Sequence, residues 1–449
     1  MSLFIAPVKI SNATRERTMY WNQEIETIDR TGLLKIQLER LKKALEAGAA
    51  TPFYKKAFAE HGIDPAKITT LDHLKDIPFT TKNDLRVSYP DGMIAVPKRS
   101  IVRMHASSGT TGKPTVIFYT MKDVDEWANQ VARGMVATGT TPDDVFQNMM
   151  GYGLFTGGLG LHYGAEKLGC LVIPMSTGNT LKQIQFIQDF GSTVIHITPS
   201  YALHLVEEIR AHGVNPPDLG VKKAYLGAEP YSEGTRDKIQ EQFGVNAYNS
   251  YGMSEMNGPG VAFECVHKNG MHLWEDYYFA EIIDPDTGEN LPDGDEGELV
   301  LTHLNREAMP VFRYRTRDLT RFIPEPCPCG RTHRRIGRIK GRTDDMMIVS
   351  GVNVFPSQIE TVLMNIPEVG NNYQIVLERE NNLDRMHIRV ELYSKMFHGD
   401  IRQLERLKKK MGEALRAIIT INPKIELLEP GSLPPSQGKA KRVFDNRSL

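Results

Sequence analysis

The middle of the chain alternates short runs of aliphatic and β-branched residues with stretches of helical pattern. Residues 171–174 read Leu-Val-Ile-Pro, and residues 194–198 read Val-Ile-His-Ile-Thr. Strand patterns that alternate with helix patterns are typical of α/β domains, in which the ligand-binding loops gather at strand ends. The alternation therefore predicts a mainly α/β domain whose site is built from loops that follow strands.

The length and charge of the chain indicate how many domains to expect and which partners to exclude. Its 449 residues exceed the size at which one hydrophobic core keeps growing, so we expect two or more domains. The formal net charge of −1 provides no general attraction to nucleic acid or to an anionic membrane. There is no apolar run of transmembrane length, and the first residues are too short and uncharged a stretch for a secretory signal, which predicts a cytoplasmic protein.

Residues 107–115 form a dense run of hydroxyls and glycines, Ser-Ser-Gly-Thr-Thr-Gly-Lys-Pro-Thr, after the strand-like segment 101–105. Glycine lets a backbone approach an anion, and hydroxyl, N–H and lysine groups supply donors and charge, so this loop suits a polyphosphate. It is not a Walker A loop, because Ser107 and Pro114 stand where that motif needs glycine and Ser or Thr. A solvated turn is the alternative. The candidate phosphate-binding residues are Ser107, Ser108, Gly109, Thr110, Thr111, Gly112 and Lys113.

Further clusters follow along the chain. Residues 148–160 are rich in glycine and contain Tyr152 and Phe155, which either form a wall for a flat ligand or pack in the core. Residues 313–318 place Asp318 among three arginines, which indicates either an ion-pair network or a nucleotide ribose site. The other clusters are Tyr-Leu-Gly-Ala-Glu-Pro at 225–230, Tyr-Asn-Ser-Tyr-Gly-Met-Ser-Glu at 248–255, Gly-Arg-Thr-Asp-Asp-Met at 341–346 and Ser-Gln-Gly-Lys-Ala-Lys-Arg at 436–442.

In order, spacing and content these clusters resemble the motifs of the adenylate-forming superfamily of acyl-CoA synthetases, luciferases and peptide-synthetase adenylation domains. Within that superfamily the chain is similar to phenylacetate-coenzyme A ligases, essentially from end to end. Residues 152–158, 227–230, 313–320 and 351–356 indicate this branch. The resemblance implies a large, multi-part α/β N-terminal domain over residues 1–343 and a smaller, mobile α+β C-terminal domain over residues 344–449.

The resemblance implies a two-step ligation. A carboxylate attacks the α-phosphorus of ATP, which gives an acyl-adenylate and pyrophosphate, and the thiol of coenzyme A then displaces AMP. Residues 107–113 would hold the β- and γ-phosphates, and Glu255 would bind Mg²⁺, which usually takes one or two protein carboxylates. Asp318 would accept from the ribose hydroxyls, and Arg342 would donate to ribose or phosphate. The residues around the α-phosphate and adenine would be Gly227, Ala228, Glu229, Pro230, Tyr251, Gly252, Met253 and Ser254.

The end of the chain is implied to carry the catalytic lysine. Lys439 stands at the Gly-Lys position of the family's C-terminal motif and would bridge the substrate carboxylate and the α-phosphate, with Lys441 as its rival. By composition alone the tail is a solvated basic segment. The family rotates its C-terminal domain between the two steps, and the hinge position matches Asp344, while Gly351 would lie beside the pantetheine tunnel.

Two regions outside the motifs have readable patterns. Leu34, Leu38, Leu41 and Leu45 share one helical face, which predicts a surface helix packed on the core. Beyond residue 344, patterns predict a helix at 358–364, a strand at 386–392, a helix that uses Leu404, Met411, Leu415 and Ile418, and residues 424–428 as a further segment. Together these elements make a compact α+β unit of domain size.

The resemblance points to phenylacetate, or to a hydroxyphenylacetate, indoleacetate or benzoate type of acid, with Tyr152, Phe155 and Gly158 as pocket candidates. One or two methylenes change pocket binding by only about 1–3 kcal/mol, so motifs do not decide among these acids. The alternatives are transfer to a carrier-protein thiol and, from a different class, a non-catalytic nucleotide-binding regulator. The family suggests a homodimer and a role in aromatic catabolism.

Four cysteines in so long a chain are not a disulfide framework. Cys265, His272, Cys327 and Cys329 would supply three thiolates and one imidazole, the ligand set of a closed structural zinc site. His267 and His333 are alternatives to His272, and Cys170 remains as a buried singleton. Four unconnected cysteines are the competing interpretation. A zinc ion here would staple the segment that leads to Arg313 and Asp318 rather than take part in the chemistry.

Overall fold

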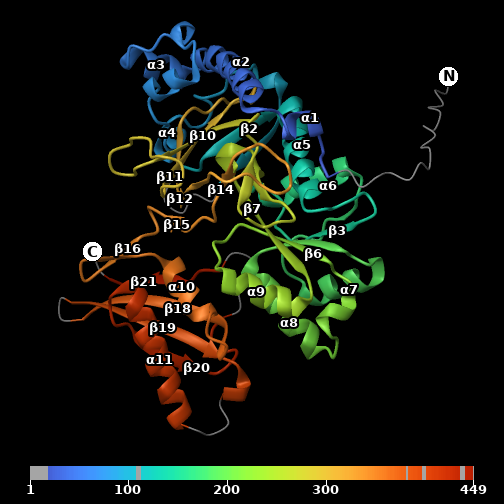
Figure 1. Cartoon of the computed structure of the whole chain (residues 1–449), viewed down its shortest axis with the longest axis vertical. Coiled ribbons are helices and arrows are strands. Elements are labelled where there is room, and N and C mark those ends of the chain that lie inside the picture. Colours follow the sequence, from blue (N-terminus) through green and yellow to red (C-terminus); the bar gives the residue numbers. More distant parts are fainter. Residues whose placement is uncertain (1–18, 108–112, 381–382, 397–400, 435–439, 448–449) are drawn as a thin grey trace, which may run out of the picture.

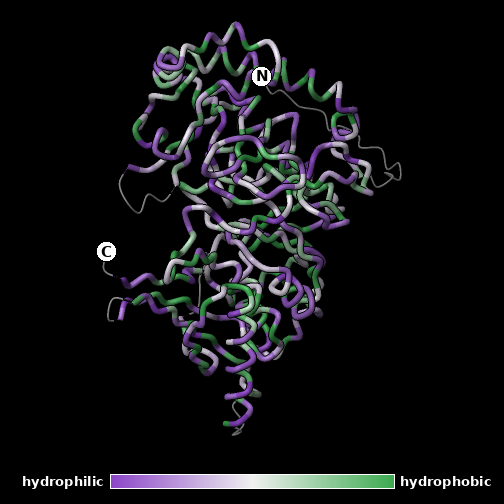
Figure 2. Tube along the Cα trace, turned by 60° about the vertical axis from the view of Figure 1, so that its left-hand side comes forward, coloured by the Kyte–Doolittle hydropathy of each residue, from purple (hydrophilic) through white to green (hydrophobic). Residues whose placement is uncertain are grey.

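The computed structural model describes residues 19–107, 113–380, 383–396, 401–434 and 440–447. A larger part, which contains the N-terminal three quarters of the chain, lies above a smaller part formed by the C-terminal quarter (Figure 1). Each part has its own hydrophobic core. Figure 2 shows hydrophobic stretches gathered inside both parts and hydrophilic stretches around them.

The larger part is organised on a nine-stranded sheet with the order β13-β14-β9-β8-β7-β6-β5-β3-β4. Five strands are parallel, and they are β3 (Val145–Asn148), β4 (Leu171–Ile173), β5 (Val194–Ile197), β6 (Lys223–Leu226) and β7 (Asn246–Met253). The others pair antiparallel, and they are β8 (Gly258–Glu264), β9 (Met271–Leu273), β13 (Phe322–Ile323) and β14 (Arg335–Ile336). All four residues of β5 are buried, as expected for a strand covered on both faces. The predicted α/β architecture is confirmed.

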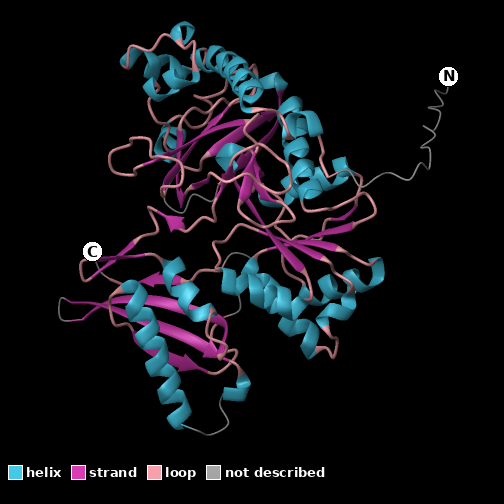
Figure 3. Cartoon of the chain, in the orientation of Figure 1, coloured by secondary structure: helices cyan, strands magenta, loops and turns pink. Residues whose placement is uncertain are grey.

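Helices connect and cover these strands (Figure 3). They are α5 (Met121–Ala137), α6 (Gly157–Leu168), α7 (Thr180–Phe190), α8 (Pro199–Ala211) and α9 (Glu233–Phe243). The N-terminal segment adds α1 (Gln23–Glu26), α2 (Arg30–Ala49), α3 (Pro52–Glu60) and α4 (Lys82–Val87). Short 3₁₀ turns span Pro65–Lys67, Leu71–Asp76, Lys98–Ser100, Pro216–Leu219, Ser254–Met256 and Ser394–Met396.

The predicted leucine face of α2 is only partly right. Leu41 and Leu45 are buried, but Leu34 is 37% exposed, and the buried face runs through Leu33 and Gln37 instead. The Gln37 side-chain N–H groups donate 2.8 Å to the carbonyl of Glu275 and 3.3 Å to that of Tyr278, so its donors are satisfied inside the core. Apolar periodicity cannot identify a buried glutamine.

Two smaller sheets complete the larger part. A hairpin pairs β1 (Ile101–Ala106) with β2 (Val116–Thr120), and the predicted phosphate loop joins them. A four-stranded antiparallel sheet contains β10 (Tyr278–Ile283), β11 (Gly297–His303), β12 (Tyr314–Thr320) and β15 (Gly341–Arg342). Its last strand leads directly into the smaller part.

The smaller part begins with a hairpin of β16 (Met347–Val349) and β17 (Val352–Val354), followed by α10 (Pro356–Met364). Its sheet has the order β20-β19-β18-β21 and is packed against α11 (Ile401–Ile419). The strands are β18 (Val369–Glu380), β19 (Leu383–Leu392), β20 (Lys424–Leu428) and β21 (Val443–Asp445). The predicted α+β unit is confirmed, although α11 buries Leu407 and Ile419 and leaves Ile418 52% exposed. In the described residues, no helix is both long and apolar enough to cross a membrane.

Candidate active site

The ends of the predicted phosphate loop lie close together, directly beyond the last residue pair of the β1–β2 hairpin, Ala106 and Val116. The Ser107 backbone N–H donates 3.0 Å to the carbonyl of Thr115, and the two side-chain hydroxyls are also hydrogen-bonded. Lys113 is exposed, with its Nζ 5.9 Å from the centroid of the Tyr89 ring. The predicted contacts of Ser108, Gly109, Thr110, Thr111 and Gly112 lie outside the described residues.

Strand β7 ends in the segment that carries the predicted magnesium ligand. Glu255 is buried, and its backbone carbonyl accepts a 2.8 Å hydrogen bond from Arg306. The Ser254 hydroxyl lies 3.2 Å from that of Thr156, so the glycine-rich segment 148–160 contacts this motif. Gly252 permits a close approach of β7 and β8, because a Cβ there would lie 2.0 Å from the carbonyl oxygen of Gly258.

Three residues from separate strands meet around one carboxylate. The Tyr251 hydroxyl of β7 donates 2.6 Å to Asp318 on β12, and Arg342 on β15 donates 3.2 Å to the other carboxylate oxygen. Asp318 and Arg342 are register partners of the β12–β15 pair. Burial raises the pKa of Asp318 to about 6, against the lowering effects of Arg342 and Tyr251.

The arginines near Asp318 in sequence are occupied elsewhere. Arg313 forms a buried ion pair with Glu281 at 2.9 Å, and Arg315 pairs with Glu298 at 2.6 Å. Arg313 and Arg315 therefore form ion pairs, which is one of the two interpretations of this cluster. Asp318 faces Tyr251 and Arg342 instead, and a ribose site there stays a prediction.

A cavity of about 270 Å³ adjoins the Tyr251–Asp318–Arg342 cluster. Ala228, at its wall, has a φ of 66°, a conformation that is uncommon for residues other than glycine and that clusters at functional sites. The predicted nucleotide residues that line this cavity are Gly227, Ala228, Glu229, Pro230, Tyr251, Gly252, Met253, Asp318 and Arg342.

The same cavity is also lined by residues that sequence reasoning missed. Arg338 donates 2.7 Å to the carbonyl of Tyr231, and its guanidinium lies 4.4 Å from the centroid of the Tyr231 ring. Asn249 and Ser250 line the cavity and belong to the 248–255 motif, so their place in that motif could have predicted them as site residues. Arg338 has no such signal, since its position depends on a contact across more than one hundred residues.

A second cavity, of about 590 Å³, lies where the two parts of the protein meet. Asp344, the predicted hinge, lines this cavity and accepts from Arg342 through both carboxylate oxygens at 2.8 and 2.9 Å. Lys441 also lines it, with its Nζ 4.9 Å from the centroid of the Phe444 ring. Lys439 lies outside the described residues.

Gly351 lies in the two-residue turn of the β16–β17 hairpin. Ser350 and Gly351 have φ values of 49° and 79° between the paired residues Val349 and Val352. Positive φ at both central positions is typical of the turn that connects such hairpins and favours glycine. Local backbone geometry therefore accounts for this glycine, and a role in CoA binding stays a prediction.

The predicted acyl-pocket residues lie on the glycine-rich segment. The Tyr152 hydroxyl accepts a 2.8 Å hydrogen bond from Asn148, and Phe155 is 50% exposed. Gly158 is buried, and a Cβ there would lie 2.7 Å from the carbonyl oxygen of Gly151. The two cavities above are lined by other residues, so the acyl pocket also stays a prediction.

The structure brings together the four predicted zinc ligands. The sulfurs of Cys265 and Cys327 are 3.6 Å apart, and the Cys329 sulfur is 3.3 Å from Nε2 of His272. Their ligand atoms all lie within 4.8 Å of one another. These separations exceed a disulfide bond of about 2.05 Å and approach the roughly 3.7 Å edge of a tetrahedral zinc site. Hydrogen bonding by Cys265 and His272 lowers the pKa of Cys329, while the hydrogen bond to Cys329 and burial raise the pKa of Cys265.

The alternative histidines have other surroundings. His333 is buried, its Nδ1 accepts from the Glu275 backbone N–H at 3.0 Å, and its Nε2 lies 2.9 Å from the carbonyl of Ile25. His267 is exposed. Nδ1 of His272 lies 3.4 Å from the carbonyl of His333, which leaves Nε2 to face the cysteines, as is usual for a metal-binding histidine.

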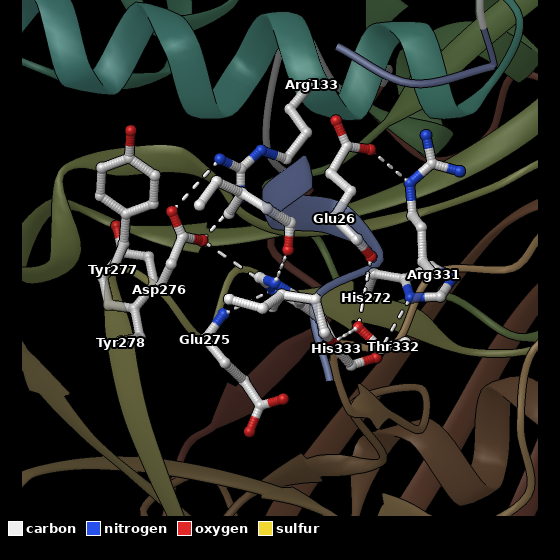
Figure 4. Close-up of polar contacts among 12 residues, drawn as sticks. Glu26, Arg133, His272, Glu275, Asp276, Tyr277, Tyr278, Arg331, Thr332 and His333 are labelled. Atoms are coloured by element: carbon white, nitrogen blue, oxygen red, sulfur yellow. Dashed lines mark hydrogen bonds and ion pairs between the residues drawn. The ribbon is translucent and has the colours of Figure 1, made fainter. Parts of the chain in front are cut away.

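Polar contacts around His272 and His333 join the segment that follows the cysteines to the N-terminal segment (Figure 4). Arg331 donates 2.7 Å to the carboxylate of Glu26, and the Thr332 backbone N–H donates 3.0 Å to the Glu26 carbonyl. Beside it, Arg133 donates 2.6 and 3.2 Å to the two oxygens of Asp276. Sequence reasoning missed these pairs, because their members are more than one hundred positions apart.

Comparison with known proteins agrees with this architecture. Residues 38–305 match the model of the AMP-binding enzyme family, and residues 351–447 match that of the AMP-binding enzyme C-terminal domain. The phenylacetate-coenzyme A ligase of Pseudomonas putida is 49% identical over 94% of this chain and 96% of its own. That of Thermus thermophilus is 48% identical over 96% of this chain and 100% of its own.

Solved structures provide a second comparison. A 2-hydroxyisobutyryl-CoA ligase in the postadenylation state, in complex with 2-HIB-AMP, superposes with a TM-score of 0.91 at 29% identity, over 98% of this chain and 94% of its own. The same enzyme with 2-HIB-AMP and CoA in the thioesterification state covers the same shares of the two chains, with a TM-score of 0.72 at 30% identity. Similarity of sequence and of structure along nearly the whole chain shows that this protein belongs to the AMP-binding enzyme family, in its branch of phenylacetate-coenzyme A ligases.

Proposed function

We propose that this protein activates phenylacetate with ATP as phenylacetyl-adenylate and transfers the acyl group to coenzyme A, with release of pyrophosphate and AMP. The observation that carries the proposal is the 49% identity to a phenylacetate-coenzyme A ligase over nearly the full length of both chains. Membership of a ligase family removes the support for a non-catalytic nucleotide-binding regulator.

The nucleotide would occupy the cavity beside Tyr251, Asp318 and Arg342. An ionised Asp318 offers two acceptor oxygens for the ribose hydroxyls, and Arg342 offers donors for ribose or phosphate. Residues 227–230 would border the adenine, and residues 107–113 would bind the β- and γ-phosphates. Glu255 is a single buried carboxylate at the end of β7, which fits a Mg²⁺ ion that takes its other oxygens from phosphate and water.

The two steps would use different orientations of the C-terminal domain, with the boundary at residues 343 and 344. Lys439 would bridge the substrate carboxylate and the α-phosphate in the first step, where stabilisation of developing charge contributes most to the rate. The closer superposition on the postadenylation state than on the thioesterification state supports an assignment of this conformation to the first step. Rotation about Asp344 would then bring Gly351 towards the pantetheine of CoA.

The Cys265, His272, Cys327 and Cys329 cluster would hold a structural zinc ion. Three thiolates and one imidazole complete a closed tetrahedron and leave no position for substrate. The ion would fix residues 327–329 against β9. Residues 327–329 follow Arg313 and Asp318 in the chain.

The family resemblance also supports proposals on localisation, oligomeric state and the acyl pocket. We expect a cytoplasmic homodimer that acts in aromatic catabolism, with Tyr152, Phe155 and Gly158 at the acyl pocket. The alternatives are preference for another aryl acid, such as a hydroxyphenylacetate, an indoleacetate or a benzoate, and transfer to a carrier protein.

A pyrophosphate-release assay with a panel of aryl and alkyl acids tests the proposal. We expect the highest kcat/KM with phenylacetate, and AMP release that depends on coenzyme A. A higher kcat/KM with a different acid would contradict the substrate, and AMP release that needs a carrier protein instead of CoA would contradict the acceptor.

A further inference from the structure

The carboxylate of Glu229 joins the two parts of the protein one residue away from Lys439. Its Oε1 accepts a 2.8 Å hydrogen bond from the Ser200 hydroxyl and another from the backbone N–H of Ala440, and its Oε2 accepts from the Ser200 backbone N–H at 3.2 Å. Ser200 lies in the first turn of α8, where backbone N–H groups lack acceptors within the helix. Donors from two distant segments therefore converge on one carboxylate.

The surrounding structure fixes both sides of this contact. Glu229 follows β6 directly after the strained Ala228. On the other side, Arg442 donates 3.3 Å to the carbonyl of Tyr373 and lies 4.5 Å from the centroid of its ring, and Val443 begins β21, which pairs with β18. The contacts of Val443 and Arg442 thus fix the segment 440–443 on the C-terminal part, and Ala440 in this segment donates to Glu229.

Glu229 also lines both cavities. It shares the smaller one with Tyr251 and Asp318, and the larger one with Asp344 and Ala440. It therefore stands between the proposed nucleotide site and the surface where the C-terminal part meets it. Burial raises the pKa of Glu229, while the hydrogen bonds from Ala440 and Ser200 lower it, so these donors stabilise the charged form.

We propose that Glu229 is a positioning residue for adenylation, which places Lys439 at the nucleotide by binding the backbone N–H of Ala440. This inference rests on the proposed function, because it requires Lys439 to act in the first step. Consecutive Cα atoms are about 3.8 Å apart, so the contact at Ala440 lies one residue from Lys439, which itself lies outside the described residues. Misplacement of a catalytic group by about 1 Å can lower a rate about 100-fold. Rotation of the C-terminal part for the second step would break the contact.

Half-reaction kinetics of Glu229→Ala test the inference. Adenylation is measured with ATP, phenylacetate and hydroxylamine without CoA, and thioester formation with preformed phenylacetyl-adenylate and CoA. We expect kcat for adenylation to fall about 10- to 100-fold, with the KM for ATP changed less than about threefold. Thioester formation should change less than about threefold, because Ala440 does not need this anchor in the second step.

Three further variants separate positioning from a role confined to the adenine border. Glu229→Gln keeps an acceptor oxygen for Ala440 and should restore most of the adenylation rate. Ser200→Ala removes one donor to Glu229 but leaves the Ala440 contact, and should have a small effect. The double variant of Glu229→Ala with Lys439→Ala should be no slower than Lys439→Ala alone, because residues that act through each other are not additive.

Different failures have different meanings. A raised KM for ATP with unchanged kcat, equal losses in both half-reactions, or additive losses in the double variant would overturn the positioning role of Glu229. If the unaltered enzyme adenylates no aryl acid, the proposed function fails, and the inference fails with it.

Discussion

The hydroxyl of Tyr251 donates a 2.6 Å hydrogen bond to the carboxylate of Asp318, across a separation of 67 positions in the chain. Because Arg342 donates to the other carboxylate oxygen, Asp318 is held between a phenol and a guanidinium at the wall of the proposed nucleotide cavity. Substitutions of Asp318 and of its partner Tyr251 therefore test whether this cavity binds the nucleotide.

Replacement of Tyr251 by phenylalanine should weaken AMP binding about 10-fold, because it removes a hydrogen bond to a charged group but keeps the ring. Isothermal titration calorimetry with AMP measures the effect. Tyr248→Phe, on the same strand, is the matched control and should bind AMP as the unaltered protein does. Equal affinities of all three proteins would contradict the role of Tyr251.

The pKa of Asp318, about 6, predicts a pH-dependent affinity for nucleotide. Below about pH 6 the carboxyl becomes protonated and loses acceptor capacity, so the affinity for AMP should fall as the pH falls. Asp318→Asn should bind AMP more weakly at neutral pH and lose this dependence between pH 5 and 7. A dependence that persists in Asp318→Asn belongs to another group.

Asp318→Asn should also stabilise the nucleotide-free protein at neutral pH. A carboxyl whose pKa is raised on folding contributes stability below its ordinary pKa of 3.8, and this contribution is lost as the pH rises through about 6. Removal of the buried charge should therefore raise the free energy of unfolding by up to about 3 kcal/mol. Thermal or urea unfolding measures this, and a clear destabilisation would assign Asp318 a structural role.

Lys439→Ala should lower the rate of acyl-adenylate formation about 100- to 1000-fold, because it removes a positive charge at the developing transition state. Thioester formation from preformed phenylacetyl-adenylate should persist. Lys441→Ala is the control and should leave both half-reactions nearly unchanged. Equal loss of both half-reactions in Lys439→Ala would refute the assignment, and an adenylation defect found only in Lys441→Ala would favour the rival lysine.

Asp344→Pro should slow the second step more than the first, because proline fixes the φ angle at the proposed hinge. Asp344→Ala removes the ion pair with Arg342 but leaves the backbone free, so it isolates the effect of that pair. Measurement of both half-reactions in the two variants distinguishes these contributions. If Asp344→Pro changed neither half-reaction, the hinge would lie elsewhere.

Metal analysis of the purified protein should find about one zinc ion per chain, as expected for one closed structural site. Cys329→Ser should lower both the zinc content and the melting temperature, since metal binding at structural sites contributes folding energy. Cys170→Ser is the matched control, because that buried thiol donates to the carbonyl of Thr141 away from the cluster, and it should retain the metal. Protein without zinc would contradict the site.

The local elements could be predicted because their causes are local. The runs at residues 171–173 and 194–197 are strands β4 and β5, and the strand predicted at 386–392 lies within β19. The prediction was weaker where burial involves a polar or end residue. Gln37 is buried through bonds to a distant backbone, and Ile418 is exposed while its neighbour Ile419 is buried.

The partners of the site residues could not be predicted in the same way. Side chains alternate between the two faces of a strand, so Asp318 shares the buried face of β12 with Tyr314 and Thr316, and Arg315 points to the opposite face. The side chains of Arg315 and Asp318 therefore lie on opposite faces of the strand, although the two residues are close in sequence. The pairing of Asp318 with Arg342 depends on the register between β12 and β15.

The sequence by itself determined the family, the order of the motifs and the local helices and strands, because each depends on residue types at short, regular spacings. Only the tertiary structure decided that Tyr251 bonds to Asp318, that His272 rather than His333 faces the cysteines, and that Glu229 holds Ala440. These contacts join segments far apart in the chain. Strand register and the docking of the two parts create them, and neither is visible in the order of residues.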